Sequence, residues 1–98
     1  MKIKTIDVNA KEWFDKVNGN SYFSANISIN FGMPSQKNLF IPFQYGYGSQ
    51  YEHEAFQELI KKGFIKNVPE RTSYWQYYRD QNIIYRHSLQ ENCKKKEL

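Results

Sequence analysis

The sequence predicts an α+β fold: an antiparallel β-meander of three strands plus a C-terminal strand, with two helices on one face. Three observations predict it, namely an Asn18-Gly19 turn between alternating segments, a helical apolar stripe after Ser49, and renewed alternation in residues 83–89. This order of elements favours helices laid over the apolar face of an antiparallel sheet. We expect one domain over residues 1–90, because 98 residues suffice for a single core, followed by a flexible basic tail over 91–98.

The first two strands are predicted as a hairpin around Asn18-Gly19. Asn-Gly favours a two-residue type I′ turn, which needs positive φ at both central positions. This turn predicts four apolar pairs on one face: Phe14 opposite Phe23, Ala10 opposite Ile27, Val8 opposite Ile29 and Ile6 opposite Phe31. Since a slip of one residue would turn this whole set outward, turn and alternation support each other.

A third strand is predicted from the alternation in residues 39–45. Its apolar residues are expected on the same face as those of the hairpin: Leu39, Ile41, Phe43 and Tyr45. Pro42 cannot donate a hydrogen bond to a neighbouring strand, so this strand is expected at a sheet edge or with a bulge.

The spacing of apolar residues after Ser49 predicts a helix over 50–62. Ser49 and Glu52 have the spacing of a capping box, and Gly63 supplies the C-terminal stop. The buried stripe is expected to contain Tyr51, Ala55, Phe56, Leu59 and Ile60.

A second, short helix is predicted over about 72–81, with Ser73 and Gln76 as another capping pair. Its aromatic residues suit either of two roles, docking the helix onto the sheet or forming an interface hot spot with the flanking arginines. The docking role is favoured because so short a helix needs an apolar face to be stable.

Composition predicts a cytoplasmic chain without a cofactor. Cys93 is the only cysteine, so it forms no internal disulfide, and with His53 and His87 it makes no convincing zinc site. No apolar stretch resembles a signal peptide or a membrane span. No serine or cysteine lies in a setting that activates a nucleophile, so we expect no enzymatic activity.

Charge is distributed unevenly between the two parts of the chain. Residues 1–60 carry five Lys against six Asp or Glu, and residues 61–98 carry nine Lys or Arg against four acids, giving −1 and +5. A basic half suits a nucleic acid or an acidic protein surface, although the run of lysines at 94–96 is most simply a solubilising end.

Nine side chains are candidates for contact with a partner. Trp13 and Tyr22 are expected on the face opposite the core, and Tyr47 lies in a Gly-rich turn before the first helix. The full set is Trp13, Tyr22, Tyr47, Tyr51, Arg71, Tyr74, Trp75, Tyr78 and Arg79. Tyr, Trp and Arg are the residue types that dominate binding energy at interfaces, while packing onto the sheet is the alternative for each aromatic side chain.

Two segments resemble a pattern that recurs in small phage and prophage proteins. They are residues 13–24, WFDKVNGNSYFS, and residues 41–48, IPFQYGYG, within a resemblance that spans roughly 5–62, with a fainter echo at 75–78. The resemblance implies an accessory protein that binds host machinery, including restriction or CRISPR complexes. The net charge of +4 departs from the acidic inhibitors that mimic DNA.

The sequence therefore predicts a non-catalytic accessory protein that binds and blocks a host protein or ribonucleoprotein. A single-stranded nucleic-acid-binding module is the first alternative, suggested by the basic second half and the aromatic residues. A structural or assembly component is the second alternative.

Overall fold

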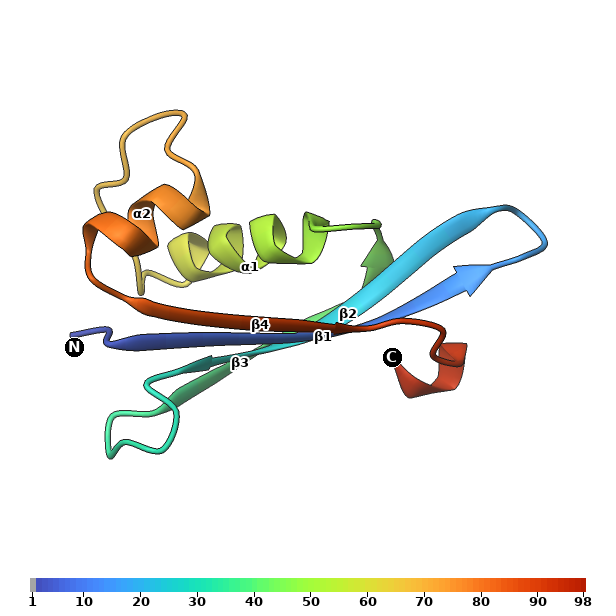
Figure 1. The fold of residues 1–98 in the computed structure, drawn as a ribbon, viewed down its shortest axis with the longest axis horizontal. Coiled ribbons are helices and arrows are strands. Elements are labelled where there is room, and N and C mark those ends of the chain that lie inside the picture. Colours follow the sequence, from blue (N-terminus) through green and yellow to red (C-terminus); the bar gives the residue numbers. More distant parts are fainter. Residues whose placement is uncertain (1) are drawn as a thin grey trace.

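The computed structural model describes residues 2–98 as one mixed sheet with two helices. The strands are β1 (Thr5–Asp15), β2 (Asn20–Ile29), β3 (Lys37–Tyr45) and β4 (Ile84–Gln90), and the helices are α1 (Gln50–Lys61) and α2 (Tyr74–Asp80). A short 3-10 helix covers Lys95–Glu97. Figure 1 shows both helices on the same side of the sheet, which confirms the α+β class.

The predicted antiparallel sheet is wrong in one respect, because β4 runs parallel to β1. The strand order is β3-β2-β1-β4, with β1 and β2, and β2 and β3, antiparallel. The physical reason lies in the path of the helices (Figure 1), which return the chain from the end of β3 to the end of the sheet where β1 begins. The strand that follows must then run in the direction of β1.

The predicted register of the first hairpin is wrong by two residues. Asp15 pairs with Asn20, so the turn holds four residues, and Val8 lies opposite Ile27 rather than Ile29. The Asp15 carboxylate stabilises this longer turn by accepting hydrogen bonds from the backbone N–H of Val17 and from the side chain of Asn18. The hydrogen bond from the Asn18 side chain lowers the pKa of Asp15.

A shift of two residues keeps the same side chains on the same face, so most of the predicted core is confirmed. Ile6, Val8 and Ala10 are buried, as are Phe23, Ala25, Ile27 and Ile29. The predicted burial of Phe14 and Phe31 is wrong, because their exposed fractions are 46% and 61%. Phe14 lies next to the last residue of β1, close to the hairpin tip, and Figure 1 shows that this tip extends beyond the end of α1.

β3 is an edge strand with a bulge, as Pro42 predicted. Ala25 pairs with Ile41 but Phe23 pairs with Gln44, so β3 has one more residue than β2 between these pairs. The bulge reverses the faces that follow it. Leu39 and Ile41 pack against the core as predicted, whereas Phe43 and Tyr45, also predicted there, lie on the opposite face beside Tyr22.

Both predicted helices are present, but neither has the predicted side-chain cap. α1 buries Tyr51, Ala55, Phe56 and Leu59, and Gly63 ends it with φ +81°. Ser49 has φ −84° and ψ 7° rather than an extended N-cap conformation, and neither it nor Ser73 makes a side-chain capping hydrogen bond.

Gly46 and Gly48 are required for different reasons in the turn that leads to α1. Gly48 has φ +62°, whereas a Cβ on Gly46 would lie 2.6 Å from the Phe23 ring. We expect Gly48→Ala to lower the free energy of unfolding by about 1 kcal/mol through backbone strain. Gly46→Ala should cost about 1 to 3 kcal/mol through overpacking. Urea denaturation of both variants tests this, and a Gly46→Ala protein as stable as the parent would contradict it.

Residues 91–98, expected to be a flexible tail, have defined contacts in the structure. Cys93 is 6% exposed, and its N–H donates to the Glu12 carbonyl. The chain beyond it turns back so that the 3-10 helix lies at the face of the sheet that the helices leave uncovered. Among residues 2–98, no helix is long and apolar enough to cross a membrane.

Candidate binding surface

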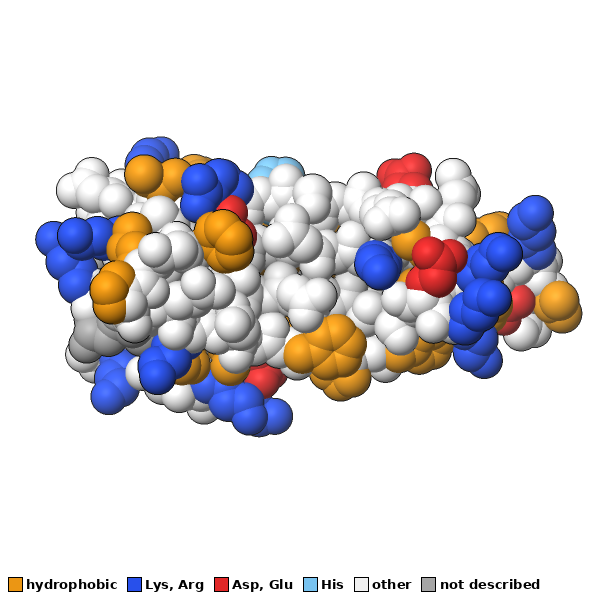
Figure 2. Space-filling model, turned by 90° about the horizontal axis from the view of Figure 1, so that it is seen from below, with side chains coloured by type: hydrophobic (Ala, Val, Ile, Leu, Met, Phe, Trp, Pro, Cys, Tyr) orange, Lys and Arg blue, Asp and Glu red, His pale blue; other side chains and the backbone are white. Residues whose placement is uncertain are grey.

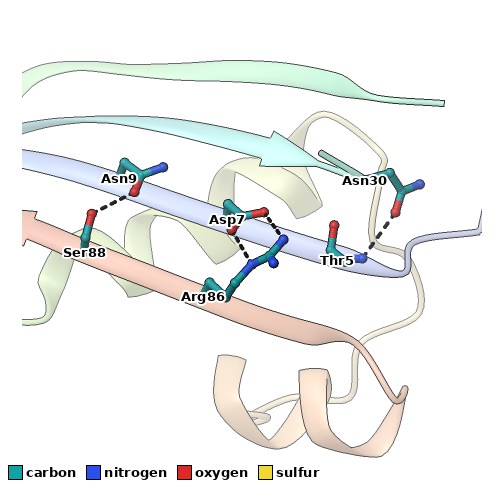
Figure 3. A network of polar contacts seen from close by, with 6 residues as sticks. All are labelled: Thr5, Asp7, Asn9, Asn30, Arg86 and Ser88. Carbon is teal, nitrogen blue, oxygen red and sulfur yellow. Dashed lines mark hydrogen bonds and ion pairs between the residues drawn. The ribbon is translucent and has the colours of Figure 1, made fainter. Parts of the chain in front are cut away.

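The face of the sheet opposite the helices, which we call the open face, is polar along its middle. Figure 3 shows the Arg86 guanidinium on the Asp7 carboxylate through two hydrogen bonds of 2.6 and 2.9 Å. Ser88 donates to the Asn9 side chain at 2.7 Å. These contacts join β4 to β1 and orient the side chains of neighbouring strands.

One end of the open face carries a cluster of aromatic side chains, which we call the aromatic patch. It consists of Trp13 from β1, Tyr22 from β2, and Phe43 and Tyr45 from β3. The ring centroids of Trp13 and Tyr22 lie 5.6 Å apart, those of Tyr22 and Phe43 lie 4.9 Å apart, and those of Trp13 and Phe43 lie 6.1 Å apart. Tyr45 meets the Tyr22 ring edge-on.

The patch remains accessible although its rings pack together. Phe43 is 39% exposed and Tyr45 is 54% exposed, while Trp13 and Tyr22 are half-buried. Farther along β3, Phe40 is also exposed, opposite Asn26 on β2. Clustered apolar side chains on a surface mark interaction sites more often than isolated ones do.

A lysine from the C-terminal segment lies over the patch. The Lys95 ammonium is 5.4 Å from the centre of the Trp13 ring and 5.9 Å from that of Phe43. Lys94 and Lys96 flank it in the sequence. Figure 2, which views the molecule from the open-face side, shows Lys and Arg side chains at both ends, one group of them at the end where Figure 1 places the hairpin tip and the C-terminal segment.

A shallow hollow lies beside the patch, between the sheet and the C-terminal segment. Its volume is about 170 Å³, and polar side chains of three strands and residues of the C-terminal segment line it, including Asn9, Ser24, Asn26, Ser88 and Leu98. The open face thus combines aromatic, amide and ammonium groups on one surface.

Of the nine predicted contact residues, the structure places Trp13 and Tyr22 in the aromatic patch. Tyr47 is 65% exposed in the turn before α1, and Trp75 is 56% exposed on α2 with the Arg79 guanidinium 5.5 Å from its ring centre. Arg71 is exposed in the loop before α2, with φ +64°.

The remaining three candidates, Tyr51, Tyr74 and Tyr78, lie between the helices and the sheet. Tyr51 and Tyr78 are 5% and 2% exposed, and Tyr74 is half-buried against Tyr78 and Tyr85. The docking role considered for the aromatic residues of α2 therefore describes Tyr74 and Tyr78, whereas Trp75 faces solvent.

A buried carboxylate holds this region together. Glu52 is 7% exposed and accepts a 2.7 Å hydrogen bond from the Tyr85 hydroxyl, while Tyr51 Oη and His87 Nδ1 lie 2.9 Å apart. Burial, followed by the hydrogen bond to Glu52, raises the pKa of Tyr85, so its hydroxyl keeps its proton and remains a donor. Sequence reasoning assigned Glu52 to a helix cap and missed this role.

The Tyr78 hydroxyl is buried among these groups without a hydrogen-bond partner. Burial, followed by the nearby charge of Glu52, raises the pKa of Tyr78. Because a buried unpaired hydroxyl costs about 1 to 3 kcal/mol, Tyr78→Phe should leave the protein at least as stable as the parent. Thermal unfolding measures this, and a large fall in melting temperature would show that the hydroxyl has a partner.

The residues of this surface that sequence reasoning missed are Phe43, Tyr45 and Lys95. Pro42 was the available signal for the first two, since a bulge there reverses the face of every later residue in β3. Lys95 gave no such signal, because its position depends on the fold of the C-terminal segment.

Comparison with known proteins finds no matching family model, no matching curated protein and no matching solved structure. Within residues 2–98, no three His, Cys, Asp or Glu side chains are grouped so that they could hold a metal ion.

Proposed function

We propose that this protein is a non-catalytic binding protein that uses the open face to occupy the surface of a host protein and block it. The observation that supports the proposal is the aromatic patch with Lys95 over it. Aromatic anchors inside a polar and charged rim are the usual arrangement of an interface with concentrated binding energy.

The charge around the patch favours a partner with an acidic surface. Three consecutive lysines, Lys94 to Lys96, lie in the C-terminal segment that reaches the patch, and the whole chain carries a net charge of +4. Complementary charges at the rim speed association and suppress wrong partners. The proposed partner therefore presents an apolar contact ringed by Asp and Glu, and a host-defence complex is the class implied by the resemblance to phage proteins.

Packing within the patch favours a protein partner over single-stranded nucleic acid. Bases bind by stacking on free aromatic faces. Here the Trp13, Tyr22 and Phe43 rings pack on one another, with Trp13 and Phe43 at interplanar angles of 29° and 10° to Tyr22, so part of each ring surface is occupied within the patch. The middle of the face presents Asn and Ser side chains and a paired Arg86.

Affinity capture from lysates of candidate hosts tests the proposal when two variants are compared with the parent. Phe43→Ala alters the patch, and Trp75→Ala removes an exposed aromatic residue from α2. We expect a stoichiometric protein with the parent and with Trp75→Ala, and its loss with Phe43→Ala. Equal capture by all three proteins would contradict an open-face site.

A second assay tests the alternative that the protein binds single-stranded nucleic acid. Binding to single-stranded DNA and RNA oligonucleotides is measured at low and at physiological salt, because phosphate contacts give affinities that fall steeply with salt. The proposal predicts weak binding that Phe43→Ala leaves unchanged. Tight, salt-sensitive binding that needs Phe43 would replace the protein partner with a nucleic acid.

A further inference from the structure

The two edges of the sheet differ in how they are protected against pairing with another strand. Edge strands expose unpaired backbone groups, and natural proteins block them with proline, lysine or a bulge. β3 begins at Lys37, contains Pro42 and is bulged. β4, whose sequence is IYRHSLQ, has no proline, no lysine and an unbroken register with β1.

The outer edge of β4 is also exposed, although Tyr74 and Tyr78 of α2 pack on Tyr85. None of its residues is buried, and only Tyr85 and Leu89 are even half-buried. Figure 1 shows the helices on one side of the sheet, with α2 near the start of β4, so a further strand would extend the sheet in its own plane beneath α2.

The free backbone groups of β4 belong to Tyr85, His87 and Leu89. The Ile84 N–H donates to the Lys4 carbonyl beside β1. Because backbone groups of successive residues in a strand point to opposite sides, Ile84, Arg86 and Ser88 bond toward β1 and the residues between them point outward. These three outward positions are spaced evenly around His87.

We propose that β4 pairs with β4 of a second copy of this chain, antiparallel and centred on His87, to form one continuous sheet. Each free group then has a partner, since His87 pairs with itself and Tyr85 pairs with Leu89. The pairing is isologous and closed by a two-fold axis, as in most soluble dimers. No like charges meet on the open face, where Arg86 lies opposite Ser88 of the other copy.

This dimer goes beyond the proposed function and does not depend on it. A two-fold axis perpendicular to the sheet would place both aromatic patches on the same side of the assembly. The dimer would then present two equivalent contact surfaces to one side.

Opposite charges at Ser88 test the pairing. Ser88 is exposed and its hydroxyl donates a hydrogen bond to the Asn9 side chain, so Ser88→Lys and Ser88→Glu lose the same hydrogen bond in the monomer. In the proposed dimer, position 88 of each copy lies opposite Arg86 of the other copy. Ser88→Lys therefore creates two like-charge pairs across the interface, whereas Ser88→Glu creates two opposite-charge pairs. We expect dimerisation measured by analytical ultracentrifugation to be about tenfold weaker for Ser88→Lys than for Ser88→Glu.

Amide hydrogen exchange locates the contact by residue. Raising the concentration of the parent should slow exchange at Tyr85, His87 and Leu89, with no change at the outward amides of β3. A protein that stays monomeric at every concentration, or a dimer in which both Ser88 variants associate equally, would overturn the proposal. Phe43→Ala should dimerise like the parent, so failure of the open-face site and failure of the dimer are distinguishable.

Discussion

Replacing Asn30 with alanine should destabilise the fold by about 3 kcal/mol, although Asn30 follows the last residue of β2 in what looks like a surface turn. The side chain is 1% exposed and accepts hydrogen bonds from the backbone N–H of Lys4 at 2.7 Å and of Thr5 at 3.2 Å. Its amide donates to the Lys2 carbonyl and to Ser35. Figure 3 shows Asn30 directed at the start of β1.

Two features add to the cost of this substitution. Alanine leaves the two backbone donors without their partner, and Asn30 has φ +54°, a conformation that asparagine tolerates better than alanine. We expect the melting temperature to fall by about 15 °C. Asn26→Ala is the matched control, because Asn26 is exposed on the strand that Asn30 follows, and this substitution should change stability by no more than about 0.5 kcal/mol. Equal effects of the two substitutions would contradict the anchoring role of Asn30.

Phe43→Ala should weaken partner binding by about 2 kcal/mol, or roughly 30-fold, as expected for an aromatic anchor of an interface. Phe43 is 39% exposed and lies beside a bulge on an edge strand, so we expect the substitution to lower the free energy of unfolding by less than about 1.5 kcal/mol. If Phe43 lay inside the core, as alternation predicts, Phe43→Ala would instead lower stability by about 3 to 5 kcal/mol.

Measuring melting temperature and affinity on the same Phe43→Ala protein separates these outcomes. Trp75→Ala removes an aromatic side chain of larger size and greater exposure, at 56%, from the helix side. It should leave affinity unchanged. A Phe43→Ala protein that melts far below the parent, and whose binding falls only with its folded fraction, would remove Phe43 from the proposed interface.

The elements of this fold could be predicted from the sequence because their patterns are local. The stripe at Tyr51, Phe56 and Leu59 has helical spacing, Gly63 ends the helix, and the strand alternation places Ile6 and Val8 in the core. These signals need only the residues within a few positions of each other.

One local turn and several features that depend on distant contacts were not predicted. The Asp15 carboxylate selects a four-residue turn over the two-residue turn that Asn18-Gly19 favours. The direction of β4 follows from the route of the helices, and the exposed position of Phe43 follows from how the strand is bulged at Pro42.

The burial of two polar side chains, Asn30 and Glu52, was also not predicted. Alternation along β2 predicts Asn30 on the outer face, together with Asn26 and Ser28, and the spacing to Ser49 predicts Glu52 in a helix cap. Both side chains are instead buried against groups more than twenty residues away, Lys4 and Tyr85. A single sequence gives no indication of which distant backbone or hydroxyl group will satisfy a polar side chain.

The two tryptophans allow the central claim to be tested in one experiment, because one lies on each side of the sheet. Trp13 belongs to the aromatic patch, and Trp75 lies on α2 among the helices. With 5-fluorotryptophan in the protein, ¹⁹F NMR gives a separate signal for each position during titration with the captured partner. An open-face interface predicts that the Trp13 signal shifts or broadens while the Trp75 signal stays in place. A change at Trp75 alone would contradict the account and place the partner on the helices.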